Sequence, residues 1–498
     1  MRKIILTVLL MTYVGLVCGQ DFQFRMGEKS NKKANAPTMI HILEGRQEGQ
    51  LLLVEPILKA VTGPFSNPVK SITVRQCDME WNDAASVTLA DTKEHSLLAA
   101  FLSGDSLHIL LSHGEKTLLR MRHVVLDARS LSVVSDNVLR DVSIQKGDEY
   151  KVWTANSLGG QYHGMVYAVW SKKGPSTAVA MMFDNNMNKL WESELEYSDI
   201  HDVLVTDGGT IATTRLGVID DNKDITAFRI NMANADGVKH GEFVLEADVS
   251  DMALLNTDGH KVLAVALEGK GGYGALRIGS LGNRSYTGVW GLVFDMDAQK
   301  ISVSNRHAFT DEEIRLFENL SAGAKMLSQK IDYVRLLDYC TTPQGGAALY
   351  QRAWKVEVRR GATSSETVHS VGILLVQADM RGELTINRIP QCNQNADWPK
   401  VGANVFPYNG KVYVLTNESK HETDEYTPDK PAQLSRSILM ANAALALYWF
   451  TPDGQGAKQL LERERKAILY APTYAGSNGR FYFLAGAIHP CLSSITLP

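Results

Sequence analysis

Residues 103–127 read SGDSLHILLSHGEKTLLRMRHVVLD, and this stretch decides the fold. Its Ser-Gly-Asp turn at 103–105 stands before an apolar run at 107–111, and a second apolar run at 124–126 ends on Asp127. Gly and Asp supply the backbone angles and local hydrogen bonds that tight hairpin turns require. The stretch therefore predicts two consecutive β-hairpins, which together make four antiparallel strands.

The same two hairpins recur along the chain. A Gly-containing turn before an alternating apolar strand is found at Gly104, Gly160, Gly209, Gly259, Gly346, Gly410 and Gly479. An apolar strand that ends near an Asp follows most copies, at Asp127, Asp184, Asp295, Asp379 and Asp453, with a looser copy at Asp236. Two hairpins per unit form a four-stranded propeller blade. The repeat predicts an all-β chain folded as a single β-propeller of about seven four-stranded blades, with six or eight as alternatives.

The ends of the chain predict how the ring closes. The seventh hairpin, at Gly479, is followed by few residues, while the strands predicted at 39–43 and 51–54 lack a repeat of their own. We expect these N-terminal strands to complete the last blade, because closure removes exposed sheet edges. The rival architecture is a pair of β-sandwiches that meet near a helical insert, and the regular two-hairpin units favour the propeller.

Two segments interrupt the repeat. Thr310 and Glu313 form a capping box before apolar residues at helical spacing, which predicts a helical insert at about 310–330. Residues 418–434 are polar and contain proline, which predicts a long surface loop.

The N-terminus predicts export. Arg2 and Lys3 precede an apolar run and the small residues Cys18 and Gly19, the pattern of a cleaved signal peptide over residues 1–19. The propeller domain would then cover 20–498. A lipoprotein in which Cys18 is acylated is the alternative, although Val17 before it fits that processing poorly. No later apolar stretch is long enough for a transmembrane helix. The predicted location is therefore the periplasm, the cell surface or the medium.

Four cysteines remain after cleavage, namely Cys77, Cys340, Cys392 and Cys491. They lack the close spacing of a zinc site, so we expect no metal. In an oxidising compartment three pairings are open, and buried free thiols are the alternative. If they pair, Cys340–Cys392 would be local and Cys77–Cys491 would join the two ends of the chain.

Three segments resemble a known family. These are 288–295 (GVWGLVFD), the acidic helical insert after it, and 345–352 (GGAALYQR). They are similar to an uncharacterised family of exported β-propeller-like proteins from Bacteroidota, by pattern over roughly 184–484, and Gln20 at the presumed mature N-terminus fits exported proteins of that phylum. The insert of this chain is shorter and less charged than the family pattern. The resemblance implies a cell-envelope propeller of unknown function and carries no catalytic residue over.

A glycine-rich stretch at 269–291 is the most conspicuous candidate for binding. It lacks the Gly-Lys-Ser/Thr of a phosphate-binding loop, and a strand pattern follows it instead of a helix. It is either a long loop between strands or a flexible binding loop. Together with the aromatic turn near 162, it supplies the binding candidates, which are Tyr162, His163, Tyr273, Arg277, Arg284, Tyr286 and Trp290.

Other chemistries have little support. The acidic turn at 220–224 lacks the Gly and Glu that a calcium loop needs at its sixth and twelfth positions. No Gly-x-Ser-x-Gly or His-Glu-x-x-His occurs, so we assign no catalytic residue and no cofactor. The net charge of −4 without a basic stripe argues against nucleic acid as a partner.

The leading hypothesis is an exported binding or scaffold protein whose ligand is a glycan, a peptide or an envelope protein, bound by loops around the channel. An architectural subunit of an envelope complex would fit the same pattern. The alternative is a secreted hydrolase or lyase acting on polysaccharide or peptide at the channel mouth, which requires titratable groups with shifted pKa values that face one pocket.

Overall fold

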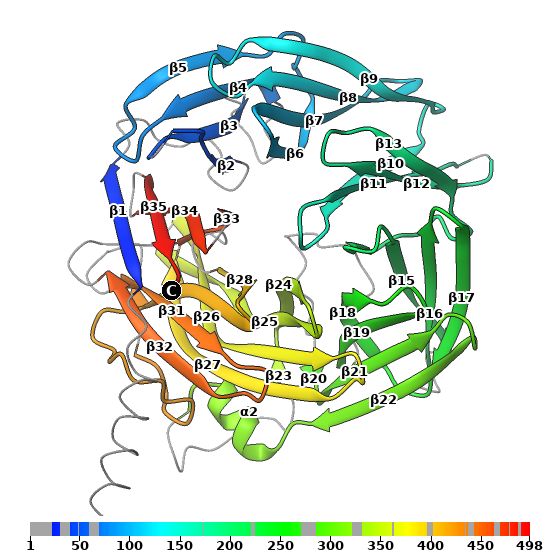
Figure 1. Cartoon of the computed structure of the whole chain (residues 1–498). Coiled ribbons are helices and arrows are strands. Elements are labelled where there is room, and N and C mark those ends of the chain that lie inside the picture. Colours follow the sequence, from blue (N-terminus) through cyan, green and yellow to red (C-terminus); the bar gives the residue numbers. More distant parts are fainter. Residues whose placement is uncertain are drawn as a thin grey trace, which may run out of the picture.

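The protein is an eight-bladed β-propeller. The computed structural model describes residues 22–498 except for 30–39, 48, 59–68, 173, 221–224, 270–284, 321–330, 361–362, 396–401, 434, 437–442, 463–468, 478 and 487–489. Eight antiparallel sheets follow one another around a ring (Figure 1). This arrangement excludes the two-sandwich alternative and confirms the all-β propeller.

The first four blades follow chain order from the inner strand outward. Blade 1 contains β2 (His41–Glu44), β3 (Leu51–Leu58), β4 (Val69–Cys77) and β5 (Asp83–Thr88). Blade 2 contains β6 (Ser96–Ser103), β7 (Ser106–Gly114), β8 (Leu118–Asp127) and β9 (Val133–Ser143). Blade 3 contains β10 (Glu149–Asn156), β11 (Tyr162–Trp170), β12 (Thr177–Asp184) and β13 (Lys189–Glu194). Blade 4 contains β14 (Asp202–Val205), β15 (Ile211–Asp220), β16 (Ile225–Asn234) and β17 (Gly237–Leu245).

The remaining blades carry the insertions. Blade 5 contains β18 (Val249–Thr257), β19 (Lys261–Glu268), β21 (Gly288–Asp295) and β22 (Lys300–Ala308). Blade 6 contains β24 (Val334–Thr342), β25 (Gly345–Arg360), β26 (Thr363–Asp379) and β27 (Leu384–Asn395), with the short β30 (Ser435–Arg436) added in parallel. Blade 7 contains β28 (Ala403–Tyr408), β29 (Lys411–Ser419), β31 (Ala443–Phe450) and β32 (Gly456–Glu462). Blade 8 contains β33 (Leu469–Ser477), β34 (Arg480–Gly486), β35 (Pro490–Thr496) and β1 (Gln23–Lys29).

The predicted blade number, about seven, was one too low. The strands near 39–43 and 51–54 do not complete the last blade, because they are the first two strands of blade 1. The turn that joins them reads Gly-Arg-Gln-Glu-Gly from Gly45 to Gly49, with Gly49 at φ 75°. It lacks the Asn-Gly or Asp-Gly pair that marks several of the other turns, so its strands were not counted as an eighth hairpin.

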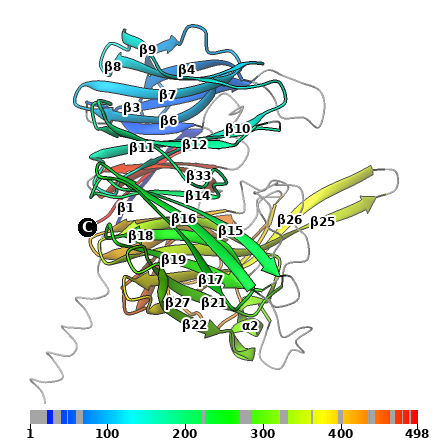
Figure 2. The same ribbon diagram turned by 90° about the vertical axis from the view of Figure 1, so that its right-hand side faces the viewer.

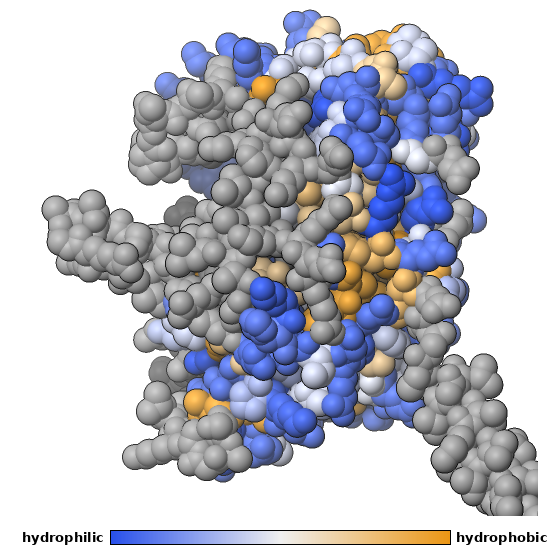
Figure 3. All heavy atoms as spheres, turned by 90° about the vertical axis from the view of Figure 1, so that its left-hand side faces the viewer, coloured by the Kyte–Doolittle hydropathy of each residue, from blue (hydrophilic) through white to orange (hydrophobic). Residues whose placement is uncertain are grey.

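Closure by an N-terminal strand is confirmed, although the strand is an earlier one. β1 pairs antiparallel with β35, from Gln23 opposite Thr496 to Lys29 opposite Cys491. Blade 1 then packs beside blade 8, where the Glu44 carboxylate accepts a hydrogen bond from the Tyr482 hydroxyl at 3.0 Å. Figure 3 shows this side of the ring, where apolar side chains remain visible among hydrophilic ones.

The Asp residues at the ends of third strands have a common structural role. The Asp184 Oδ1 atom accepts backbone N–H groups of Asn186 and Asn188 at 2.9 and 2.8 Å. Asp127, Asp295 and Asp379 make the corresponding bonds in their own turns. A short carboxylate satisfies the turn's amides without help from another strand, which is why Asp recurs there.

The two faces of the ring differ. In the first seven blades, the turns between the first and second strands and between the third and fourth strands lie on one face, which we call the turn face. We call the opposite face the loop face. Helix α2 (Asp311–Phe317) lies in the connection between blades 5 and 6, and the Thr310–Glu313 capping box is present as predicted. The rest of the predicted insert, 321–330, lies outside the described residues. The strands β25 and β26 extend beyond their blade as a projecting hairpin on the loop face (Figure 2).

The long loop predicted at 418–434 begins two residues later than predicted, at residue 420. Glu418 and Ser419 are the last residues of β29. Glu418 is buried there, and its Oε2 atom lies 3.2 Å from Lys458 Nζ. Residues 420–433 form neither helix nor strand.

The hydrophobic core is a series of layers between neighbouring blades. Between blades 8 and 1, Leu484 and Tyr482 pack with Ile42 and Leu51. Between blades 4 and 5, Phe228 and Phe294 meet at 5.0 Å between ring centroids. Each fully buried side chain of this size contributes roughly 2 kcal/mol. Because every blade shares a layer with both neighbours, the packing favours a closed ring.

The sheet topology separates Cys340 from Cys392. Cys340 lies on the innermost strand of blade 6 and Cys392 on the fourth. Three strand spacings, roughly 14 Å, lie between those strands, and a disulfide requires Cα atoms within about 7 Å. This pairing was therefore a wrong prediction. Cys77 and Cys491 are both buried on neighbouring blades, and their pairing stays a prediction.

The predicted signal peptide, 1–19, lies outside the described residues. No helix in the described part of the chain is long and apolar enough to cross a membrane.

The closing strand gives a direct test of the fold. A Cβ atom added at Gly27 would lie 1.9 Å from the Met79 carbonyl oxygen of blade 1. We expect Gly27→Ala to lower the free energy of unfolding by about 2 kcal/mol, measured by urea denaturation, because backbone must move to relieve the overlap. The matched control is Gly217→Ala, where nothing lies within 4 Å of the added atom. Equal stabilities for the two variants would contradict the placement of β1.

Candidate functional site

A pocket opens on the turn face between blades 4 and 5. Its volume is about 510 Å³. Its walls are the turns of blade 4 that follow β14 and β16, and the turn of blade 5 that follows β18. Neighbouring blades bring these turns together, although they are far apart in the sequence.

The lining is rich in hydrogen-bonding groups. It contains three hydroxyls, one amide, two carboxylates, two basic side chains and three glycines, with only two apolar side chains. These residues are Thr206, Thr210, Thr257, Asn234, Asp236, Asp258, Lys239, His260, Gly208, Gly237, Gly259, Met232 and Val238. Buried Met232 forms part of the wall and accepts a hydrogen bond from the Thr257 hydroxyl at 3.6 Å. Such a lining suits a polar ligand with many hydroxyl groups.

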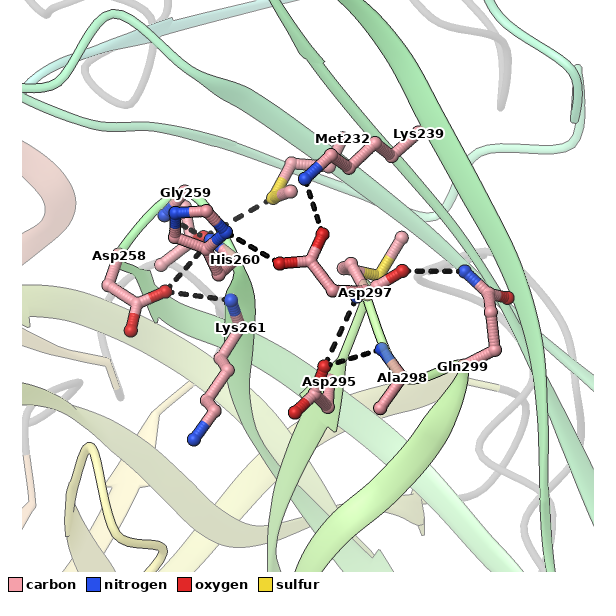
Figure 4. Close-up of polar contacts among 12 residues, drawn as sticks. Met232, Lys239, Asp258, Gly259, His260, Lys261, Asp295, Asp297, Ala298 and Gln299 are labelled. Atoms are coloured by element: carbon pink, nitrogen blue, oxygen red, sulfur yellow. Dashed lines mark hydrogen bonds and ion pairs between the residues drawn. The ribbon is translucent and has the colours of Figure 1, made fainter.

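A fourth turn fixes the basic side chains of the pocket. Asp297, in the turn between β21 and β22, accepts a hydrogen bond from Lys239 Nζ at 2.5 Å and contacts His260 Nδ1 at 2.6 Å (Figure 4). The hydrogen bonds from these two side chains lower the pKa of Asp297, which therefore stays ionised. Lys239 and His260 come from different blades, so one carboxylate joins both sides of the pocket.

Asp258 holds the turn on the blade 5 side. Its Oδ1 atom accepts the backbone N–H groups of His260 and Lys261 at 2.9 and 2.7 Å (Figure 4). Gly259 within this turn has φ 89°, a left-handed conformation that glycine adopts at no steric cost. The carboxylate of Asp258 is exposed at the pocket.

Two predicted binding residues lie near this face. Tyr162 begins β11 and stands beside the next turn, since its ring would be 3.7 Å from a Cβ atom at Gly209. Gly208, one residue earlier, lines the pocket. His163 points elsewhere: it is buried, stacks on Phe101 at 3.7 Å, and bonds Asn156 through Nδ1 at 2.8 Å. Burial lowers the pKa of His163 to about 4.

The other predicted residues are not brought to the pocket. Tyr273, Arg277 and Arg284 lie outside the described residues. Tyr286 is fully buried, and its hydroxyl donates to the Asp251 carboxylate. Trp290 lies toward the loop-face end of β21, where its Nε1 atom donates to Glu268 at 3.0 Å.

Sequence reasoning recognised several turns of the pocket without combining them. Asp207-Gly208-Gly209, Asp258-Gly259 and Asp236-Gly237 were all identified as hairpin signals. Their meeting depends on which turns neighbouring blades place side by side, and no local pattern carries that information. Asp297 follows the recurring Asp295, which was the available signal for its turn.

Two further acids stabilise the innermost strands. Asp202 in blade 4 accepts the Leu254 N–H of blade 5 at 2.8 Å. Asp338 in blade 6 accepts the Val405 N–H of blade 7 at 2.9 Å. Burial raises the pKa of Asp202 to about 6 and that of Asp338 to about 7. Because their oxygens bind backbone amides of the next blade, their evident role is to join blades.

The residues that the structure describes contain no group of three or more His, Cys, Asp or Glu side chains that could hold a metal ion.

Comparison with known proteins identifies no family for this chain. No protein-family model and no curated protein sequence matches the chain. Among solved structures, the β-propeller domain of the Trilobed protease from Pyrococcus furiosus is 10% identical, with a TM-score of 0.33, over 80% of this chain and 96% of that one. A Synechocystis apocarotenoid oxygenase mutant is 11% identical, with a TM-score of 0.36, over 96% of this chain and 93% of that one. The α-L-arabinofuranosidase Arb93A from Fusarium graminearum is 9% identical, with a TM-score of 0.32, over 80% and 93%. Likenesses this remote say nothing about ligand or reaction.

The raised pKa of Asp338 predicts a pH dependence. The folded protein binds a proton at Asp338 up to about pH 7, whereas the unfolded chain releases it near the ordinary value of 3.8. The contribution of Asp338 to the free energy of unfolding is therefore fully present below about pH 4, and it is lost as the pH rises through 7. We expect the stability advantage of the wild type over Asp338→Asn to be larger at pH 5 than at pH 8 by about 2 kcal/mol.

Urea denaturation of both proteins at the two pH values measures this difference. The control is Asp207→Asn, an exposed acid on the turn face. If the free energies of unfolding of the wild type and Asp338→Asn differ by the same amount at both pH values, Asp338 is not protonated in the folded protein.

Proposed function

We propose that this chain is an exported binding protein of the cell envelope, whose pocket between blades 4 and 5 holds a small hydroxyl-rich ligand of the mono- or disaccharide class. The observation that carries the proposal is the pocket itself, with its volume of about 510 Å³ and its mainly polar lining. Ligand pockets of small molecules commonly have volumes of about 300–1,000 Å³. Export rests on the N-terminal sequence pattern, and envelope placement on the family resemblance.

The chemistry of the lining supports a sugar over the other predicted ligand classes. A peptide or partner protein is usually bound through apolar and aromatic anchors, and this pocket has Met232 and Val238 as its apolar members. The Thr206 and Thr210 hydroxyls, the Asn234 amide and the backbone at three glycines can exchange hydrogen bonds with sugar hydroxyls. Tyr162, beside the neighbouring turn, supplies an aromatic surface close to the rim.

The hydrolase or lyase hypothesis receives less support from this pocket. Sugar hydrolysis commonly needs one carboxyl group that stays protonated near neutral pH and a second that is ionised. Asp297 is held ionised by its two donors. Among the described acids with a raised pKa, Asp202 and Asp338 bind backbone amides on the innermost strands, and Glu418 is buried in blade 7 beside Lys458. Binding without turnover is therefore the function that the geometry favours.

Saturation-transfer NMR with a panel of D-glucose, D-galactose, D-mannose, their amino and N-acetylamino forms, cellobiose and lactose tests the proposal. We expect at least one of these sugars to bind the wild type, and Val238→Trp to weaken its binding at least tenfold, because the larger side chain fills the pocket. The matched control is Val244→Trp, which changes an exposed valine of the same strand outside the pocket. No binding by any sugar, or equal binding by Val238→Trp, would contradict the proposal.

A further inference from the structure

The basic side chains of the pocket are already paired. Lys239 and His260 both contact the Asp297 carboxylate, at 2.5 and 2.6 Å (Figure 4). The side chain of Lys261, the next residue, is not part of the pocket wall. A ligand that enters therefore meets little positive charge that is free to bind an acidic group.

The carboxylates of the lining are in the opposite situation. Asp236 and Asp258 are exposed, and neither forms an ion pair with any residue in the described part of the chain. Asp258 uses Oδ1 for the two backbone amides of its turn, which leaves Oδ2 available. The two acids come from neighbouring blades, since Asp236 belongs to blade 4 and Asp258 to blade 5.

From this charge balance we infer that the pocket selects an amino sugar, whose ammonium group pairs with the Asp236 and Asp258 carboxylates; the inference rests on the proposed sugar-binding function. A protonated amine has three donors and is matched by carboxylates on two sides. The hydroxyl and glycine groups of the remaining lining then bind the ring hydroxyls. Charge-assisted hydrogen bonds are about twice as strong as neutral ones, so the amine decides the selectivity.

Isothermal titration with D-glucosamine, D-glucose and N-acetyl-D-glucosamine at pH 7 tests the inference. The three sugars share their ring size, and only glucosamine carries a positive charge. We expect glucosamine to bind about tenfold more tightly than glucose, a ratio that one hydrogen bond to a charged group commonly produces. Raising the salt concentration should reduce this preference, because the carboxylates are exposed and therefore screened.

Charge-neutral variants locate the effect. Asp258→Asn keeps the turn, because the amide oxygen of asparagine can accept the same two backbone bonds. We expect Asp258→Asn and Asp236→Asn each to reduce the preference for glucosamine over glucose to about threefold or less. The matched control is Asp127→Asn, which makes the same substitution at a turn of the same kind in blade 2, far from the pocket.

The possible results separate the inference from the function on which it rests. Equal binding of glucosamine and glucose would overturn the charge selection and leave sugar binding intact. No binding of any of the three sugars by a folded wild type would remove both. A preference for glucosamine that survives both Asn substitutions would overturn the assignment to Asp236 and Asp258. Tighter binding of Nα-acetyl-lysine amide than of glucosamine would show that the carboxylates serve an amine of another class.

Discussion

The pairing of β1 with β35 is the constraint on which the rest of the structure depends. An isolated four-stranded blade exposes both of its apolar faces, and each face is covered only by a neighbouring blade. In an open row, each of the two terminal blades would lack one neighbour. One apolar face of its sheet would then stay in contact with water. Because β1 adds the fourth strand to a blade built from the end of the chain, the row closes and all eight interblade layers are complete. β1 and the C-terminal strand β35 are thereby held on the same blade.

The pocket follows from that closed geometry. Antiparallel strands place two turns of blade 4 and two of blade 5 on one face, and the packing of these blades brings their turns together. Each turn is locally stable, since an Asp side chain accepts its backbone N–H groups or a glycine adopts the positive φ angle that it needs. The turns can therefore carry Thr, Asn, Lys and His without loss of fold. Asp297 connects the two blades through Lys239 and His260, which gives the pocket a defined width and leaves its other carboxylates for a ligand.

Local patterns in the sequence predicted the hairpins well and the assembly less well. The Gly-containing and Asp-terminated turns were recognised because each depends on a few adjacent residues. The blade count failed at Gly45–Gly49, whose turn residues are uncommon, and this error also moved the closing strand from β1 to β2 and β3. The pairing of Cys340 with Cys392 failed because the distance in sequence does not tell how many strands separate two residues across a sheet.

The pocket was missed for a related reason: its residues are ordinary turn residues until neighbouring blades bring them together. Tyr162 was chosen as an aromatic residue beside a turn, and it does lie next to a turn that lines the pocket.

The central claim is that residues near the N-terminus form the fourth strand of the last blade. Hydrogen–deuterium exchange followed by mass spectrometry tests it on the intact protein, because backbone amides in a paired strand exchange slowly. The account predicts that the hydrogen-bonded amides of the edge strand Gln23–Lys29 exchange slowly, and that they lose protection together with those of Pro490–Thr496 in denaturant. Complete exchange of Gln23–Lys29 within seconds, while β35 stays protected, would contradict it.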